Sequence, residues 1–221
     1  MQLIHQIFGG ISKQNLNTLF EALQIQNRHY SKGSLLLEQG AENEYIRILV
    51  QGKAHAVGYT ADGREVDFAV LKDGDLFGDA LALSLGHHSP VSIYAESDCV
   101  VAMFPYRLLL ESHHPCAYIV LKNLAGEVAE KFFAMQQRVR YITQPSLRDK
   151  IMAYLEDCRL SAGSDSFSIP FDRKNLASFL CCDRSALCRE LTVLKSEGLI
   201  DYKKNLFYIL KPSGGLFAKN D

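Results

Sequence analysis

The chain changes its hydrophobic period once, near residue 115, and this change limits the folds open to it. Between Tyr30 and Phe104, short apolar runs such as "GSLLLEQG", "IRILVQG" and "SIYAESDCVVAMF" are separated by glycines at 33, 40, 52, 63, 74 and 78. This spacing is typical of a β-sandwich or barrel, and the Asp-Gly of "ADGRE" suits a tight hairpin. We therefore predict about eight short strands, preceded by a helix from Ser12 to about Gln24.

After Pro115 the apolar residues follow a helical period up to about Thr143, at alternating intervals of four and three. The seam consists of Leu121, Ala125, Val128, Phe132, Met135, Val139 and Ile142. A helix of about 27 residues would be about 40 Å long. A core helix on the barrel could show such a pattern, but a sustained heptad seam favours pairing of two helices. We therefore predict a helix with the barrel on one side and a twin helix on the other.

Composition narrows the class of protein further. The 221 residues are 48% hydrophobic, which suffices for a core, and no run of 18 apolar residues predicts a membrane span. The start "MQLIHQIFGG" lacks the features of a signal peptide, and six scattered cysteines favour a reducing, cytoplasmic setting. Residues 1–144 hold 12 basic and 15 acidic residues, and residues 145–221 hold 12 and 10. This asymmetry slightly favours phosphate binding by the C-terminal third.

Two short helices with a bend between them are predicted in "RKNLASFLCCDRSALCRELTVLKSEG". Pro145 marks a boundary before this region, and "SLRDKIMAYLEDCRL" and "FSIPF" predict a helix and a short edge strand. Asp172 and Asp183 each precede a helix and can cap it, and Gly198 can end the second one. Leucines at helical spacing give each helix an inward face. The short "CCD" connection predicts a steep crossing, as in a helix-turn-helix.

The outward face of the second helix is suited to DNA. It carries Arg184, Ser185, Cys188, Arg189 and Thr192. Because arginine can donate two hydrogen bonds to guanine in the major groove, we predict that Arg189 reads a base, with Arg184 and Ser185 near a base or its phosphate. The hairpin predicted in "DYKKNLFYIL" places Lys203 and Lys204 at its tip, as a wing would. A solvated charged face is the alternative interpretation of such a helix.

These motifs resemble those of the Crp/Fnr superfamily of bacterial transcription regulators over nearly the whole chain. "KGSLLLEQG", "ILVQG" and "LKDGDLFGD" are similar to its cyclic-nucleotide-binding β-roll, and Phe171 to Ile200 to its winged helix. The resemblance implies an α+β fold with an N-terminal double-stranded β-helix (jelly-roll-like) sensor domain at 1–114. A long dimerisation helix and hinge would follow at 115–144, and a winged helix-turn-helix DNA-binding domain at 145–221. It also implies that Arg189 reads bases and that Arg173 contacts the DNA backbone.

Departures from the family pattern concern the effector. The resemblance places Gly78 and Asp79 in the phosphate cassette of the cyclic-AMP-binding branch, but Ser89 and Pro90 replace its arginine and serine. Met135 and Gln136 replace hydroxyl residues of that branch on the long helix. Without the arginine nothing obvious neutralises a cyclic phosphate, so we do not expect cyclic AMP to be the effector. An organic acid, a phenolic compound, haem or a gas ligand stays open.

The cysteines and histidines limit the metal and redox chemistry that the sequence allows. The oxygen-sensing branch needs an N-terminal cysteine cluster, but no cysteine precedes Cys99, so no iron–sulfur cluster is expected. Cys181, Cys182 and Cys188 flank the recognition helix and permit a redox switch, with a thiolate favoured at Cys182, or they act as small hydrophobic residues. The histidine pairs 87–88 and 113–114 lack further ligands at metal-binding spacing, so we predict no metal site and no enzyme activity.

These observations predict a cytoplasmic, homodimeric transcription regulator that binds an inverted-repeat operator in double-stranded DNA. A small-molecule or redox signal in the N-terminal domain would control it allosterically, and RNA polymerase is a further candidate partner. The alternative is a cyclic-nucleotide-type sensor whose C-terminal domain binds protein instead of DNA. The sequence does not distinguish an activator from a repressor, and it does not give the operator or the effector.

Overall fold

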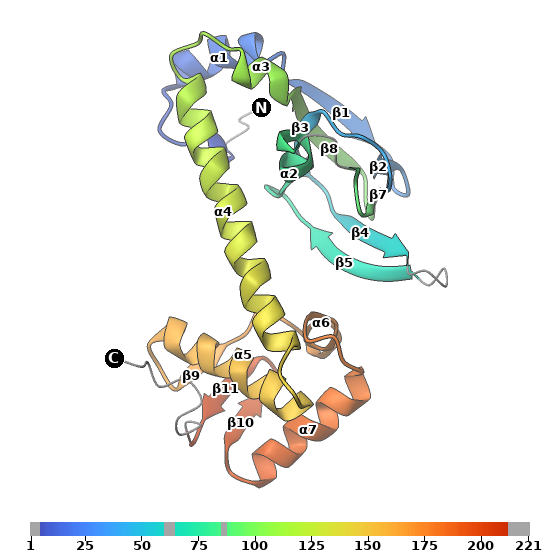
Figure 1. The fold of residues 1–221 in the computed structure, drawn as a ribbon, viewed down its shortest axis with the longest axis vertical. Coiled ribbons are helices and arrows are strands. Elements are labelled where there is room, and N and C mark those ends of the chain that lie inside the picture. Colours follow the sequence, from blue (N-terminus) through green and yellow to red (C-terminus); the bar gives the residue numbers. More distant parts are fainter. Residues whose placement is uncertain (1–4, 60–64, 85–87, 212–221) are drawn as a thin grey trace. The chain divides into compact units, whose positions relative to one another are not determined.

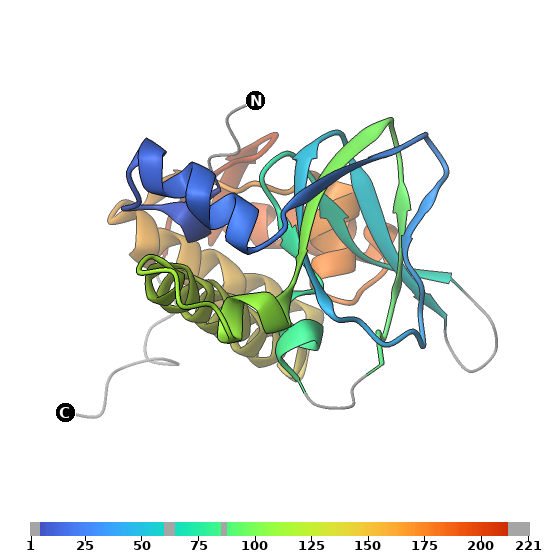
Figure 2. The same cartoon turned by 90° about the horizontal axis from the view of Figure 1, so that it is seen from above.

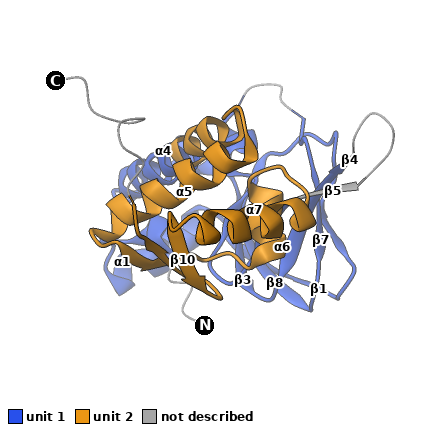
Figure 3. Cartoon of the chain, turned by 90° about the horizontal axis from the view of Figure 1, so that it is seen from below, with its two compact units in different colours: residues 1–131 blue, residues 132–221 orange. Residues whose placement is uncertain are grey.

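The computed structural model describes residues 5–59, 65–84 and 88–211 of the chain. It divides into two compact units, Met1–Lys131 and Phe132–Asp221, which are coloured separately in Figure 3. The division falls inside the long helix, whereas the sequence suggested boundaries at residues 114 and 144. The three-part division into 1–114, 115–144 and 145–221 stays a prediction, and each compact unit is described by itself below.

The first unit is a roll of two antiparallel four-stranded sheets (Figure 1). One sheet has the order β1-β8-β3-β6 and the other β2-β7-β4-β5. The strands are β1 (Gln26–Tyr30), β2 (Leu35–Leu37), β3 (Tyr45–Gln51), β4 (Ala54–Tyr59), β5 (Glu65–Leu71), β6 (Leu76–Phe77), β7 (Ser92–Ala95) and β8 (Cys99–Pro105). The prediction of about eight short strands is therefore confirmed. The turn residues of the predicted "ADGRE" hairpin lie outside the described residues.

Two hydrophobic clusters hold this unit together. One lies between the sheets and takes Leu49, Phe77 and Val101 from the first sheet and Ala56 and Ile93 from the second. The other lies under the helices that cover the outer face of the first sheet. These are η1 (Gln6–Phe8), α1 (Lys13–Ala22), α3 (Tyr106–Leu110) and the start of α4 (Ala117–Ile142), as Figures 1 and 2 show. The short α2 (Asp79–Leu83) follows β6.

Local chemistry explains where these elements begin and turn. Ser12 caps α1, because its hydroxyl accepts a hydrogen bond from the backbone N–H of Asn15, as predicted. Gly52 turns the chain between β3 and β4 with φ of +110°, and a Cβ there would lie 2.5 Å from the carbonyl oxygen of Asp98. Only glycine fits such a corner without a shift of the backbone.

Helix α4 runs without interruption through 26 residues, about 39 Å at the α-helical rise. At its start, Val120 and Leu124 are buried in the core of the first unit. At its end, Tyr141 is buried in the core of the second unit. The predicted long helix is thus present, and it contributes residues to both cores.

Besides the end of α4, the described part of the second unit contains three helices and a three-stranded sheet. Its elements are α5 (Leu147–Ala162), β9 (Ser166–Ser168), α6 (Arg173–Phe179), α7 (Arg184–Ser196), β10 (Ile200–Lys203) and β11 (Leu206–Ile209). The sheet order β10-β11-β9 makes β9 an edge strand, and it ends before Pro170, which cannot donate to a ladder. Leucines of all three helices and Phe207 form one core. This is the architecture of a winged helix.

Candidate DNA-binding surface and effector site

The turn between α6 and α7 is fixed by two aspartate caps. Asp172 accepts a hydrogen bond from the N–H of Asn175 at 2.8 Å, and Asp183 accepts from the N–H groups of Ser185 and Ala186 at 2.8 and 3.3 Å. Hydrogen bonds from the Ser185 hydroxyl and the two backbone groups lower the pKa of Asp183. Between the helices, Cys181 adopts a left-handed conformation with φ of +51°, which favours glycine and strains the backbone at this residue.

Helix α7 buries one face and exposes the other. Leu187, Leu191 and Leu194 are fully buried, as the periodicity predicts, whereas Arg184 and Arg189 are exposed. Within the described part of the chain, neither of these two guanidinium groups has an ion-pair partner. Ser185 is also exposed, but its hydroxyl donates to the Asp183 carboxylate at 2.5 Å. The structure therefore gives Ser185 a capping role that the sequence reading had not assigned.

The hairpin of β10 and β11 exposes Lys203 and Lys204 at its tip. Arg173 at the start of α6 is held against this hairpin. Its guanidinium lies 4.9 Å from the ring centre of Tyr202 and 5.0 Å from that of Phe207, and it donates to the carbonyl of Lys204 at 2.9 Å. Arg173 thus orients the wing, and its predicted contact with the DNA backbone stays a prediction.

Arg138, near the end of α4, is a residue that the sequence reading missed. It donates to the carbonyls of Phe179 and Ser178 at 3.0 and 3.2 Å, which are among the last backbone acceptors of α6. Its guanidinium also lies 5.4 Å from the Phe179 ring centre. An arginine on a helix surface gives no sequence signal for such a cap, since the partners are backbone atoms about 40 residues away.

A cavity of about 530 Å³ lies beside this junction in the second unit. Its wall includes an aromatic cluster in which Tyr141 and Phe179 each pack against Tyr154, and Phe179 also packs against Phe171. The Asp157 carboxylate at its edge accepts hydrogen bonds from Arg140 and from the Tyr141 hydroxyl. Burial and the Asp157 carboxylate raise the pKa of Tyr141, so this phenol stays protonated and donates.

All six cysteines are free thiols in this structure. The sequence predicted a stabilised thiolate at Cys182, but burial is the main effect there and raises its pKa, which makes the expectation wrong. Cys181 is exposed and its sulfur lies 4.0 Å from Nη2 of Arg138. Cys188 is half-buried. A redox role for these residues stays a prediction.

The turn at Gly78 and Asp79 is held by internal polar contacts in the first unit. Asp79 is 4% exposed, and Nζ of Lys131 donates to both of its carboxylate oxygens at 3.0 and 2.9 Å. Lys131, from α4, also donates to the carbonyl of Leu76 at 2.8 Å. Nδ2 of Asn43 donates to the carbonyl of Gly78 at 2.7 Å. The acid of the proposed cassette is therefore already neutralised by a lysine of the same chain.

The other four candidate effector residues belong to both units. Ser89 is buried and donates to the carbonyl of Val91 at 2.7 Å, while Pro90 is exposed. Met135 and Gln136 are exposed on the part of α4 that belongs to the second unit. Gly78 and Asp79 begin the short α2, and a common effector site for all six residues stays a prediction.

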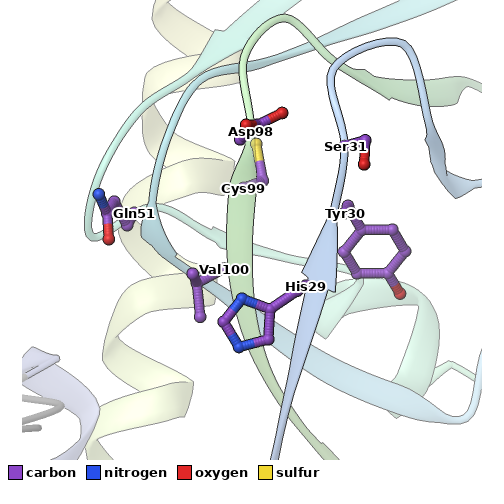
Figure 4. Close-up of a pocket in the computed structure, with 7 residues that line it drawn as sticks. All are labelled: His29, Tyr30, Ser31, Gln51, Asp98, Cys99 and Val100. Carbon is purple, nitrogen blue, oxygen red and sulfur yellow. The ribbon is translucent and has the colours of Figure 1, made fainter.

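A small depression of about 260 Å³ lies at the ends of β1 and β8 in the first unit (Figure 4). Figure 4 shows that His29 and Tyr30 leave β1 on opposite sides. Nearby polar groups are engaged, since Asp98 accepts from the N–H of Lys32 at 2.9 Å and Cys99 donates to the carbonyl of Lys53 at 3.3 Å. None of the predicted site residues lies in it.

The predicted seam of α4 is half-buried at both ends and exposes three large apolar side chains between them. Leu121 packs against the core of the first unit, whereas Phe132, Met135 and Val139 are 49%, 58% and 48% exposed.

Among the described residues, no group of three or more potential ligands could hold a metal ion. None of the described helices combines the length and hydrophobicity of a membrane span.

A roll of two sheets, a long helix and a winged helix with exposed arginines define the class of ligand-sensing, DNA-binding regulators. Comparisons with known proteins agree. Residues 27–112 match the family model of the cyclic nucleotide-binding domain. The chain is 24% identical to the probable transcriptional regulator flp of Lacticaseibacillus casei, over 79% of this chain and 78% of that protein. It is 23% identical to the cAMP-activated global transcriptional regulator CRP of Pasteurella multocida, over 77% and 83%.

Among solved structures, the c-di-GMP-responsive global regulator CLP of Xanthomonas campestris superposes with a TM-score of 0.61 at 15% identity, covering 90% of this chain and all of that one. This likeness concerns the fold. The sequence matches above make the chain similar to transcription regulators of the Crp/Fnr superfamily, with a cyclic-nucleotide-binding-like domain at residues 27–112.

Proposed function

We propose that this regulator acts in the cytoplasm as a homodimer that binds an inverted-repeat operator and responds to an effector other than cyclic AMP. The outward face of α7 is the observation that most supports DNA binding. Arg184 and Arg189 are exposed there without ion-pair partners in the described chain, and the exposed Lys203 and Lys204 form the wing tip. Such groups suit base edges and phosphates respectively.

Dimerisation through α4 is supported by the exposed half of its seam. Phe132, Met135 and Val139 repeat at heptad spacing and leave large apolar side chains half in solvent. Pairing with a second copy would bury them. The two recognition helices would then lie about one DNA turn apart, roughly 34 Å.

The effector is proposed to differ from cyclic AMP because no arginine stands in the cassette and Lys131 engages Asp79. The similar proteins themselves differ, since one is named cAMP-activated and another c-di-GMP-responsive. Native mass spectrometry of the purified protein, followed by denaturation, tests this part. Retained cyclic AMP would contradict the proposal, whereas another small molecule or haem would identify the effector class.

A salt titration separates DNA binding from the alternative of docking to a protein. Binding of the dimer to a fluorescent duplex that carries a selected operator should weaken by several orders of magnitude between about 50 and 200 mM salt, because phosphate contacts release counterions. For the double variant Lys203→Gln and Lys204→Gln, the plot of log affinity against log salt concentration should be less steep. Its slope should be smaller in magnitude by about two at most, because two phosphate contacts are lost. Salt-independent or absent binding would contradict a DNA-binding function and favour a protein partner.

A further inference from the structure

The first unit contains a half-buried arginine for which the described chain provides no carboxylate partner. Arg47 lies on β3, and its Nη1 donates to Oδ1 of Asn43 and, at 3.2 Å, to the carbonyl of Tyr45. Its Nε is buried and has no hydrogen-bond partner among the described residues. Burial lowers the pKa of Arg47, and the nearby Arg28 lowers it further. Because a guanidinium that is partly removed from water and lacks an anion is costly, this arrangement favours a negative group beside it.

Strand register places Arg47 and Arg28 on the inner face of the roll. Residues directly opposite each other in an antiparallel pair project from the same face. Arg47 is opposite Met103 on β8, and Arg28 is opposite Val101. Val101 and Leu49, its other partner, belong to the cluster between the two sheets. Both arginines therefore face the interior that the sheets enclose.

Two inner-face residues of the edge strand β1 are exposed to solvent. Gln26 and Arg28 on β1 face inward but are exposed, although inner-face residues deeper in the roll are buried. The surroundings combine apolar and aromatic groups: Met103 is 3% exposed, Tyr30 packs on the inner cluster, and the Tyr45 ring centre lies 5.6 Å from the Arg47 guanidinium. A molecule with an apolar body and one anionic group would fit these groups.

We propose that Arg47 and Arg28 form an anion-binding site on the inner face of β1 and β3, which takes a small organic acid or phosphate ester as the effector. The inference rests on the proposed function and names the chemical class of its signal. The site replaces the missing cassette arginine with guanidinium groups from a different wall of the roll. Arg47 also lies beside the cassette turn, since a Cβ on Gly78 would be 3.2 Å from its Nη1.

The test measures ligand-induced changes in the thermal unfolding midpoint of the full-length protein at constant ionic strength. The probes are sodium benzoate, inorganic phosphate and, as the uncharged counterpart of benzoate, benzamide. Benzoate, phosphate or both should raise the midpoint in proportion to the logarithm of their concentration, and benzamide should not. Benzoate alone would indicate a carboxylate effector, and phosphate alone a phosphate ester.

The variants locate the site. Arg28→Gln, at an exposed position that should not affect folding, and Arg47→Gln should weaken the apparent affinity for the active anion about tenfold or more. Arg107→Gln removes an exposed arginine of α3 and serves as the matched control, with the wild-type response. No response to either anion in the wild type, or an equal response in Arg28→Gln, would overturn the proposal.

Operator binding is measured on the same samples, so that the anion site and the proposed DNA-binding function can each be contradicted independently of the other. A protein that binds its operator but shows no anion response overturns the anion site alone. A protein that responds to anions through Arg28 and Arg47 but does not bind DNA overturns the proposed function, while the anion site remains supported.

Discussion

Arg189 and Arg173 lie on the two neighbouring helices α7 and α6 of the second unit, yet their surroundings give them different tasks. Arg189 is exposed on α7 with no ion-pair partner among the described residues. Arg173 is stacked on Tyr202 and Phe207 and donates to the backbone of the wing. A guanidinium that is free to move can read a base, whereas one that is already engaged mainly positions its neighbours.

The exposed position of Arg189 predicts a loss of specificity on truncation. Arg189→Ala should weaken binding to the specific operator by about 1–3 kcal/mol, because a bidentate contact with guanine is lost, and should leave non-specific binding nearly unchanged. Fluorescence anisotropy with operator and scrambled duplexes measures both. Arg107→Ala, in the other unit, is the control and should change neither. An equal loss on both duplexes would make Arg189 a phosphate contact.

Among the secondary-structure elements, α7 depends at its start on the ionised carboxylate of Asp183, which caps the helix. Hydrogen bonds from Ser185 and Ala186 lower the folded-state pKa of Asp183 below the unfolded value of about 4. The stability from this group is therefore fully present above that unfolded value and is lost as the pH falls through the lowered pKa. Asp183→Asn keeps an acceptor at the cap but cannot titrate.

We expect the unfolding midpoint of Asp183→Asn to fall less than that of the wild type between pH 7 and pH 3. Thermal melts followed by circular dichroism at several pH values measure this difference. Asp165→Asn, which removes another exposed acid of the same unit outside α7, serves as the control. Identical acid sensitivity of Asp183→Asn and wild type would show that the cap does not titrate in this range.

Helix α4 has two kinds of surface along its length. Its first turns are buried against the core of the first unit, and its middle leaves Phe132, Met135 and Val139 exposed. If these residues pair with a second copy, Met135→Glu places two unpaired carboxylates in an apolar seam and should weaken the dimer at least about 100-fold. Sedimentation velocity at micromolar concentration should then show a monomer.

The neighbouring variant Gln136→Glu adds the same charge one position away from the seam and should remain dimeric. This control separates seam disruption from a general effect of charge on α4. A dimer that survives Met135→Glu would place the interface elsewhere on the chain.

At the scale of the whole molecule, a two-fold dimer imposes symmetry on its operator. Selection from random duplexes should yield an inverted repeat whose half-sites lie about 10 base pairs apart, centre to centre. Insertion of five base pairs between them rotates one half-site by about half a turn and should reduce affinity to the non-specific level. An unchanged affinity for that duplex, or selection of a single half-site, would contradict binding as a rigid symmetric dimer.

Residue spacing alone predicted most of the elements in their order, but not the short η1, α2 and α3. Glycine corners, the heptad period and the aspartate caps act locally, so eight strands, one long helix and the helix-turn-helix could be predicted from residue spacing. Only the tertiary structure decided which polar groups meet. Lys131 neutralises Asp79, which lies 52 residues away in the sequence. Arg138 caps α6 across a sequence separation of 40 residues or more. Strand register turns Arg28 and Arg47 toward the same interior. Such contacts depend on distances across the fold, because a long cationic side chain takes the partner that packing brings within reach, and no local pattern encodes that choice.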